Sequence, residues 1–266
     1  MLQLFLNSKF NYPRRIFRKL YGIILSSRYV INPEDQANNF SRLDLNRDEG
    51  LLLLNKVLVE LDGNNYDENN GMFSEHLILL SSISIASSQI RSVLEIGTYD
   101  GKTSVILNKI FPEASITTID LPIKDKDFES TYNRSGSANT FADKRNTLLN
   151  SSNQIKFLEI NSIALSEMDN KFDVIWIDGA HGYPVVAMDI INTFRLCNKG
   201  GYVLVDDVWK NERISDKYYH SVGAMQSLSE LKSANLIDEY FLIPKRISSY
   251  FNLPWNKKFI GFFRKT

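Results

Sequence analysis

The sequence has a single cysteine, Cys197, so it cannot form an internal disulfide. No apolar run approaches the roughly 18 residues that a membrane-spanning helix needs. The N-terminus lacks the apolar stretch of a secretory signal peptide, and no segment repeats with a period of about 20 to 50 residues. These absences argue against secreted, membrane-spanning and repeat proteins, and we expect a cytoplasmic protein.

Acidic residues are missing from residues 1–30, which carry six lysines and arginines interleaved with apolar side chains. Such a segment suits peripheral contact with an anionic membrane, here the inner membrane face. It equally suits an amphipathic helix packed on the catalytic domain or on a second subunit of a homo-oligomer, and the packed helix is favoured. The rest of the chain has 25 bases against 31 acids, so nucleic acid is not an expected partner.

The chain does have enough apolar residues for one core, because 43% of its 266 residues are hydrophobic and 23% are charged. No change in composition divides it into two catalytic parts. We expect an N-terminal helical extension over residues 1–70, made of the basic arm and a helix, and one catalytic domain over 71–266. A further helix, predicted over 71–90, should cover the edge of a sheet.

The most informative stretch is an apolar strand pattern that ends in the turn Glu95-Ile96-Gly97-Thr98-Tyr99-Asp100-Gly101. Glycine adopts positive φ at little cost and lets a ligand approach the main chain. The helix predicted over 102–111 then offers its free N–H groups to that ligand. A second strand pattern ends in Asp120, about 20 residues later, the separation expected for a carboxylate that binds a ribose diol. The pattern predicts a βαβ nucleoside-binding unit, the alternative being a packing bend without a ligand.

Spacing and charge narrow the choice of ligand. A phosphate-binding P-loop needs one more residue between its first glycine and its Gly-Lys-Thr than Gly97 and Gly101 enclose. A dinucleotide fingerprint that starts at Gly97 would need two further glycines where the chain has tyrosine and lysine. Glu95 and Asp100 would also repel a phosphate. These residues favour a cationic ligand without phosphates, a description that S-adenosylmethionine meets.

The turn resembles the first motif of the class I S-adenosylmethionine-dependent methyltransferases, an acid-x-Gly-x-x-x-Gly sequence, and the similarity spans about residues 73–265. The resemblance implies an α/β fold with a Rossmann-like, seven-stranded, mostly parallel sheet, helices on both faces, and a C-terminal antiparallel hairpin over 240–244 and 258–263. It also implies that the turn lines the methionine end of the cofactor, that Asp120 binds the ribose, and that Asn161 and Ser162 flank the adenine. The cofactor-binding residues expected on this basis are Glu95, Gly97, Thr98, Tyr99, Gly101, Thr103, Ser104, Asp120, Asn161, Ser162 and Asp178.

Two further apolar strand patterns end in polar residues, the first in Asp178-Gly179-Ala180-His181 and the second in Asp206-Asp207. In a parallel sheet such strand ends share one edge, where ligands bind. Three carboxylates at one edge repel one another unless a proton or a metal neutralises them, and an all-oxygen set favours Mg²⁺. His181 can accept a proton from a substrate hydroxyl at neutral pH, the alternative being a hydrogen-bonding role beside the site.

These residues resemble the metal-dependent O-methyltransferases, in particular the branch that methylates sugar hydroxyls. The resemblance implies that Asp178, Asp206 and Asp207 bind Mg²⁺ and that His181 is the general base. We therefore expect O-methyl transfer to a hydroxylated small molecule, a sugar or glycan precursor. Three alternatives stay open: helix-capping and loop roles for these acids, a metal-free methyltransferase of another small molecule, and a scaffold that binds the cofactor without catalysis.

Overall fold

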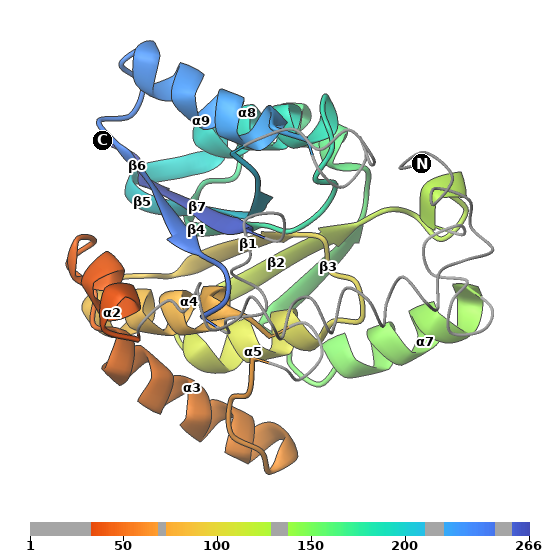
Figure 1. Cartoon of the computed structure of the whole chain (residues 1–266). Coiled ribbons are helices and arrows are strands. Elements are labelled where there is room, and N and C mark those ends of the chain that lie inside the picture. Colours follow the sequence, from red (N-terminus) through yellow and green to blue (C-terminus); the bar gives the residue numbers. More distant parts are fainter. Residues whose placement is uncertain (1–32, 69–72, 129–137, 211–220, 248–256) are drawn as a thin grey trace, which may run out of the picture.

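The computed structural model describes residues 33–68, 73–128, 138–210, 221–247 and 257–266. Its centre is a seven-stranded sheet with the strand order β3-β2-β1-β4-β5-β7-β6 (Figure 1). Strands β1 to β5 are parallel, whereas β7 runs antiparallel to both β5 and β6, which confirms the expected fold and its C-terminal hairpin. The strands are β1 (Ser92–Ile96), β2 (Ser115–Asp120), β3 (Ile155–Glu159), β4 (Phe172–Ile177), β5 (Cys197–Val208), β6 (Tyr240–Pro244) and β7 (Phe259–Arg264).

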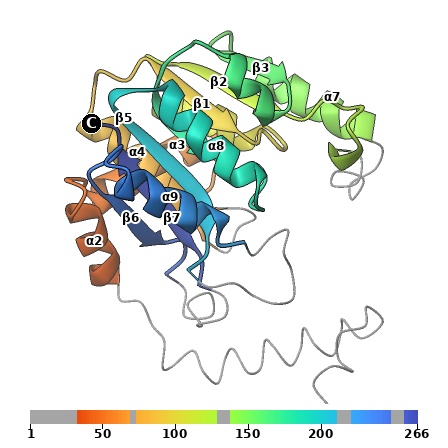
Figure 2. The same cartoon turned by 90° about the horizontal axis from the view of Figure 1, so that it is seen from above.

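Helices cover both faces of the sheet. Figure 1 shows α3, α4, α5 and α7 on one side and α8 and α9 on the other, and Figure 2 shows α8 and α9 lying across the strands. The helix expected over 71–90 is α4, which is shorter and covers a face rather than an edge, because nine of its twelve residues are buried. The helices are α2 (Pro33–Ser41), α3 (Arg47–Asp62), α4 (Glu75–Ala86), α5 (Lys102–Ile110), α7 (Ala138–Leu149), α8 (Val185–Leu196), α9 (Gly223–Ser233) and the 3₁₀-helix η4 (Ser162–Glu167).

Buried apolar side chains on both faces of the central strands hold these layers together. Successive side chains of a strand point to opposite faces. In β4, Val174 and Trp176 join the cluster formed with α3, α4 and α5, whereas Ile175 and Ile177 join the cluster formed with α8 and α9. The continuous apolar run of β4 follows from this burial on both faces.

The helices α3 and α4 are joined by a buried ion pair. Arg47, at the start of α3, donates from Nε and Nη2 to the two carboxylate oxygens of Glu75, at the start of α4, over 2.8 and 2.7 Å. The two side chains are 8% and 0% exposed, so water does not screen the pair. Asn46 sets the start of α3 because its side chain accepts hydrogen bonds from the N–H groups of Asp48 and Glu49.

The Arg47→Ala variant should lose about 3 kcal/mol of unfolding free energy, because it leaves the buried Glu75 carboxylate without its partner. Denaturation in urea measures the loss. The matched control is Lys109→Ala, which removes the exposed ion pair with Glu60 and should cost less than about 1 kcal/mol. Equal losses in the two variants would contradict a structural role for the buried pair.

The strand order places the site. The chain runs outward from β1 through β2 to β3 and then returns to β4 on the other side of β1. Ligands of open α/β sheets bind beyond the carboxyl ends of the strands where the order reverses in this way. Ile96 and Ile177 are paired at the ends of β1 and β4, so the residues that follow them, Gly97 and Asp178, lie together at this reversal.

Two expectations fall on other parts of the chain. The basic segment 1–30 and the boundary between residues 70 and 71 lie outside the described residues. Among the described residues, the helices α2 and α3 share a hydrophobic cluster with α4 and the sheet. None of the described helices has both the length and the hydrophobicity that crossing a membrane requires.

Candidate active site

The turn after β1 packs closely against the residues that follow β4. Gly97 has φ 102° and Gly101 has φ 83°, in the left-handed region that favours glycine. A Cβ atom at Gly97 would lie 2.3 Å from the carbonyl oxygen of Asp178, which is closer than any real contact. The N–H of Asp178 in turn donates to the carbonyl oxygen of Ile96 over 2.8 Å. The first glycine of the motif is therefore required by the approach of two backbones.

Glu95 lies beneath this turn and is completely buried. Its Oε2 accepts hydrogen bonds from the hydroxyl groups of Ser104 on α5 and Thr118 on β2. Its Oε1 has no hydrogen-bond partner among the described residues. Burial raises the pKa of Glu95 to about 7, although these two hydrogen bonds oppose the shift. Glu95 is thus an acid that a nearby positive charge would ionise.

Asp120 connects the end of β2 to the turn. Its Oδ2 accepts a hydrogen bond from the N–H of Tyr99 over 2.8 Å, and its Oδ1 accepts one from the N–H of Leu121 over the same distance. After β3, the side chain of Asn161 accepts a hydrogen bond from the N–H of Ile163 and caps η4, which begins at Ser162. The predicted cofactor residues therefore follow β1, β2, β3 and β4 at one edge of the sheet, and their individual roles stay predictions.

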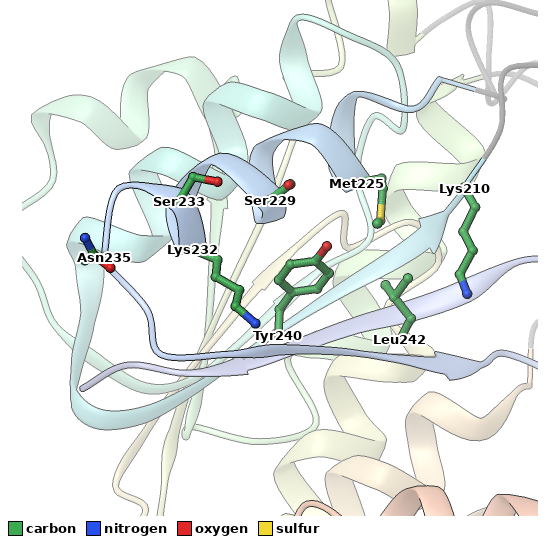
Figure 3. Close-up of a pocket in the computed structure, with 8 residues that line it drawn as sticks. All are labelled: Lys210, Met225, Ser229, Lys232, Ser233, Asn235, Tyr240 and Leu242. Atoms are coloured by element: carbon green, nitrogen blue, oxygen red, sulfur yellow. The ribbon is translucent and has the colours of Figure 1, made fainter.

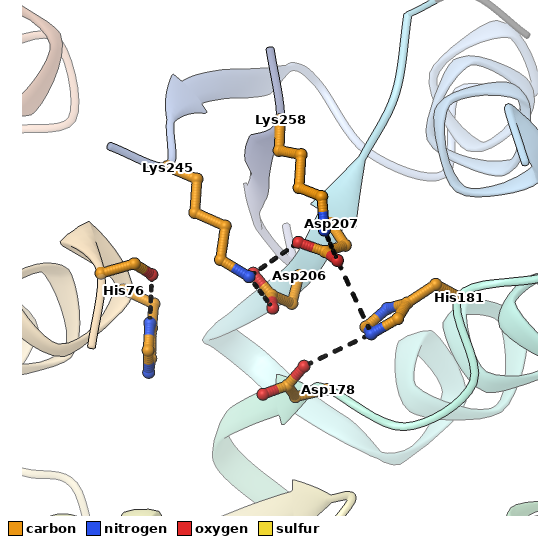
Figure 4. Close-up of polar contacts among 8 residues, drawn as sticks. His76, Asp178, His181, Asp206, Asp207, Lys245 and Lys258 are labelled. Carbon is orange, nitrogen blue, oxygen red and sulfur yellow. Dashed lines mark hydrogen bonds and ion pairs between the residues drawn. The ribbon is translucent and has the colours of Figure 1, made fainter. Parts of the chain in front are cut away.

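The predicted catalytic and metal-binding residues, Asp178, His181, Asp206 and Asp207, also lie together at the carboxyl ends of the strands. Nε2 of His181 lies 3.7 Å from Oδ1 of Asp178 and 3.9 Å from Oδ2 of Asp207, as Figure 4 shows. Burial lowers the pKa of His181, although Asp207 and Asp206 oppose the shift, so its imidazole is neutral at pH 7. Burial and the facing Asp206 carboxylate raise the pKa of Asp178 well above its usual value.

Two lysines that the sequence reasoning missed complete the cluster. Lys245, directly after β6, donates hydrogen bonds to Oδ2 of Asp206 and, over 2.7 Å, to Oδ1 of Asp207. Lys258, directly before β7, donates to Oδ2 of Asp207. Burial raises the pKa of Asp206 and Asp207, but the Lys245 ammonium and the other cationic groups around them together outweigh it, so both pKa values are lowered.

The position of these two lysines near Asp206 and Asp207 could have been predicted from the sequence. They flank the two strand patterns of the expected hairpin, and Phe259 at the start of β7 is paired with both Val208 and Pro244. An antiparallel hairpin beside β5 therefore brings one end of each of its strands to the edge where Asp206 and Asp207 lie.

Residues 94–208 match a family model described as a methyltransferase domain, and this segment contains the turn at Gly97, Asp178 and the Asp206-Asp207 pair. This segment is similar to a methyltransferase domain, and the chain has the fold of the class I S-adenosylmethionine-dependent methyltransferases. The matched segment thus holds the strands β2, β1, β4 and β5 that surround the reversal of strand order.

Solved structures share the fold of this chain. A candidate O-methyltransferase from Klebsiella pneumoniae is 15% identical, with 83% of this chain and 90% of that chain covered and a TM-score of 0.51. A candidate caffeoyl-CoA O-methyltransferase from Staphylococcus aureus is 17% identical, with 79% and 91% covered and a TM-score of 0.50. Cofactor-bound Rv0187 from MTB is 16% identical, with 80% and 89% covered and a TM-score of 0.50. No curated protein matches the sequence.

Lysines hold three of the six carboxylate oxygens of Asp178, Asp206 and Asp207. Both oxygens of Asp207 and one of Asp206 accept hydrogen bonds from ammonium groups. One ligand atom each from Asp178, His181 and Asp206 lies within 4.8 Å of the others. A metal held there would occupy the His181 nitrogen and sit next to the Lys245 ammonium. The all-oxygen set predicted for Mg²⁺ does not fit this arrangement, because lysines hold both oxygens of Asp207 and leave only Oδ1 of Asp206 without a hydrogen-bond partner among the described residues.

Replacing Glu95 by glutamine should change how stability depends on pH. The pKa of Glu95 is about 7 in the folded chain against a reference value of 4.5, so the stability that its neutral form contributes is complete below 4.5 and is lost as the pH rises through 7. Glutamine does not ionise, so Glu95→Gln should gain on the wild type by up to about 3 kcal/mol between about pH 5 and about pH 8. Denaturant titrations at both pH values measure this, with the exposed Glu167→Gln as control. Parallel pH curves for wild type and Glu95→Gln would contradict the raised pKa.

A separate pocket of about 670 Å³ lies between α9 and β6. Figure 3 shows Lys232 and Tyr240 at this pocket, with Lys210 at its other end. None of the predicted site residues lines it. This pocket is therefore not the cofactor site of the methyltransferase.

Proposed function

We propose that this methyltransferase transfers the methyl group of S-adenosylmethionine to a hydroxyl oxygen of a small molecule, with a sugar or glycan precursor as the expected acceptor. The observation that carries the proposal is the position of the His181 imidazole, whose Nε2 lies within 4 Å of both Asp178 and Asp207 at the carboxyl ends of the strands. The backbone of Asp178, one of these two acids, is in turn in close contact with the Gly97 turn. Two proteins of similar structure are candidate O-methyltransferases, which supports oxygen as the methylated atom.

The residues of the turn bind and orient the cofactor. S-adenosylmethionine, when bound, supplies a methyl group on a positively charged sulfur. The buried Glu95 and the carboxylates of Asp120 and Asp178 provide the negative charge that such a ligand requires, and Asp120 suits the ribose diol. The closely packed turn fixes the position of the methyl group, and methyl transfer depends mainly on proximity and orientation.

His181 removes the proton of the acceptor hydroxyl. Its Nε2 would accept this proton, and the bound cofactor would supply the methyl group to the hydroxyl oxygen, with the electron pair of the carbon–sulfur bond staying on sulfur. Asp178 and Asp207 then stabilise the imidazolium that has formed, because both carboxylates lie within 4 Å of Nε2. This scheme contains no divalent ion, since lysines hold both oxygens of Asp207 and one oxygen of Asp206.

Two measurements test the proposal. Isothermal titration of the full chain with S-adenosylmethionine should show binding at one site. A panel of sugars, glycan precursors and other hydroxylated small molecules should then include one that causes release of S-adenosylhomocysteine. The absence of binding would refute the cofactor assignment, and binding without turnover on any acceptor would favour the scaffold alternative.

A further inference from the structure

We propose that the Lys245 ammonium group is a built-in cation that replaces a divalent ion at Asp206 and Asp207, so that the methyltransferase works without a metal. This inference rests on the proposed function for its catalytic meaning, whereas its geometry stands separately. Lys245 acts as a positioning residue, because it holds two carboxylates rather than touching the reacting atoms.

Two carboxylates share the ammonium group of Lys245, as they would share a bound metal ion. This ammonium donates to one oxygen of Asp206 and one of Asp207, and Lys258 donates to the second oxygen of Asp207 (Figure 4). The side chains of Lys245, Asp206 and Asp207 are 12%, 3% and 9% exposed. Ion pairs so little exposed to water are screened only weakly. The two ammonium groups balance the charges of Asp206 and Asp207, which lessens the need for a divalent ion.

The backbone of β5 is bent so that both carboxylates reach the same lysine. Successive side chains of a regular strand point to opposite faces, so two adjacent aspartates would normally point apart. The pairing of β5 with β7 shifts register between Val205 and Val208, and Asp207 has φ 51°, an unfavourable value for a residue with a side chain. The contacts with the lysines offset this strain.

Three hydrogen bonds fix the main chain at Pro244 and Lys245. The N–H of Lys245 donates to the carbonyl oxygen of Lys258 over 3.0 Å, and its own carbonyl oxygen accepts from the N–H of Glu75 over 3.0 Å. The preceding residue, Pro244, accepts a buried hydrogen bond of 2.8 Å from Gln36 on α2. Lys245 is thus fixed by α2, α4 and β7, as a ligand-holding position would be, and its side chain has little freedom to leave the acids.

Divalent-ion titrations of the full chain test the inference. Thermal unfolding and isothermal titration with Mg²⁺ and Mn²⁺ should show no stabilisation and no stoichiometric binding for the wild type. Lys245→Met should lower the unfolding temperature by roughly 5 °C or more, and either ion should restore at least about half of that loss, because the freed carboxylates then bind it. Lys245→Arg keeps the charge and should remain unresponsive to either ion. The exposed Lys199→Met, at the other end of β5, is the matched control and should behave as the wild type.

Separate measurements test this inference and the proposed function, so that either one can fail without the other. Stoichiometric Mg²⁺ or Mn²⁺ binding by the wild type would overturn the inference, as would a folded Lys245→Met variant that gains no response to either ion. If Lys245→Met does not fold, the wild-type and Lys245→Arg titrations still decide. Cofactor binding is measured in separate titrations with S-adenosylmethionine, so its failure would refute the proposed function without altering the metal result.

Discussion

The Gly97→Ala variant is expected to lose cofactor binding and most of its stability. Its methyl group would lie 2.3 Å from the carbonyl oxygen and 2.7 Å from the carbonyl carbon of Asp178, so either the turn or the end of β4 must move. The residue would also hold φ 102°, which alanine adopts only under strain. We expect a loss of more than about 4 kcal/mol of unfolding free energy. Since displacement of a site by about 1 Å can cost about 100-fold, affinity for S-adenosylhomocysteine should fall by at least that factor.

Gly63→Ala is the matched control for this variant. Gly63 ends α3 with φ 78°, and a Cβ atom there would meet nothing within 4 Å. The control therefore measures backbone strain alone, which should cost about 1 kcal/mol and leave cofactor affinity unchanged. Chemical denaturation and calorimetric titration give both quantities for the two variants. Cofactor affinity of Gly97→Ala within about threefold of the wild type would show that the close contact with β4 is not needed for binding.

The His181→Ala variant should reduce kcat by about 10²–10⁴-fold, the usual contribution of a general base. Cofactor affinity should change by less than about threefold, since the predicted cofactor contacts lie on other residues. Because burial places the pKa of His181 below its usual 6.5, the wild-type kcat should stay level from neutral pH down to this pKa and fall only below it, where the imidazolium cannot accept a proton. The variant should lack this fall. Release of S-adenosylhomocysteine, measured against pH with an identified acceptor, provides both results.

A second histidine offers the control. His76 on α4 is buried and stacks on Trp176 with ring centroids 4.7 Å apart, while its Nδ1 forms a hydrogen bond with Ser74. Burial lowers the pKa of His76 to about 3, so it stays neutral throughout the pH range of the experiment. His76→Phe keeps the ring and should cost stability without changing kcat beyond about threefold. If His181→Ala instead loses less than about tenfold in kcat, His181 is a hydrogen-bonding partner rather than the base.

Sequence reasoning worked best where the pattern is local. The glycines of the turn, the strand that ends in Asp120 and the two strands that end in acids follow from periodicity and turn chemistry over fewer than about 15 residues each. The structure places all of them at one edge of the sheet, as expected from parallel pairing. The helix expected over 71–90 was misplaced, because an apolar helix pattern does not say whether it covers an edge or a face.

The groups that neutralise Asp178, Asp206 and Asp207 could not be predicted from short stretches of the sequence. The sequence correctly grouped Asp178, Asp206 and Asp207, and charge repulsion correctly demanded a neutralising partner. The partners considered were a proton and a metal, whereas the structure supplies Lys245 and Lys258 from the C-terminal hairpin. Their ammonium groups reach the acids only because β7 is inserted beside β5 in the antiparallel direction.

The sequence by itself determined the fold class and the position of the predicted cofactor turn, because strand patterns and glycine turns can be recognised within short stretches of the chain. Only the tertiary structure decided what balances the charge of the acids and how deeply Glu95 and His181 are buried. Burial and ion pairing between residues tens of positions apart depend on how the strands are ordered and bent, and no short-range pattern carries that information.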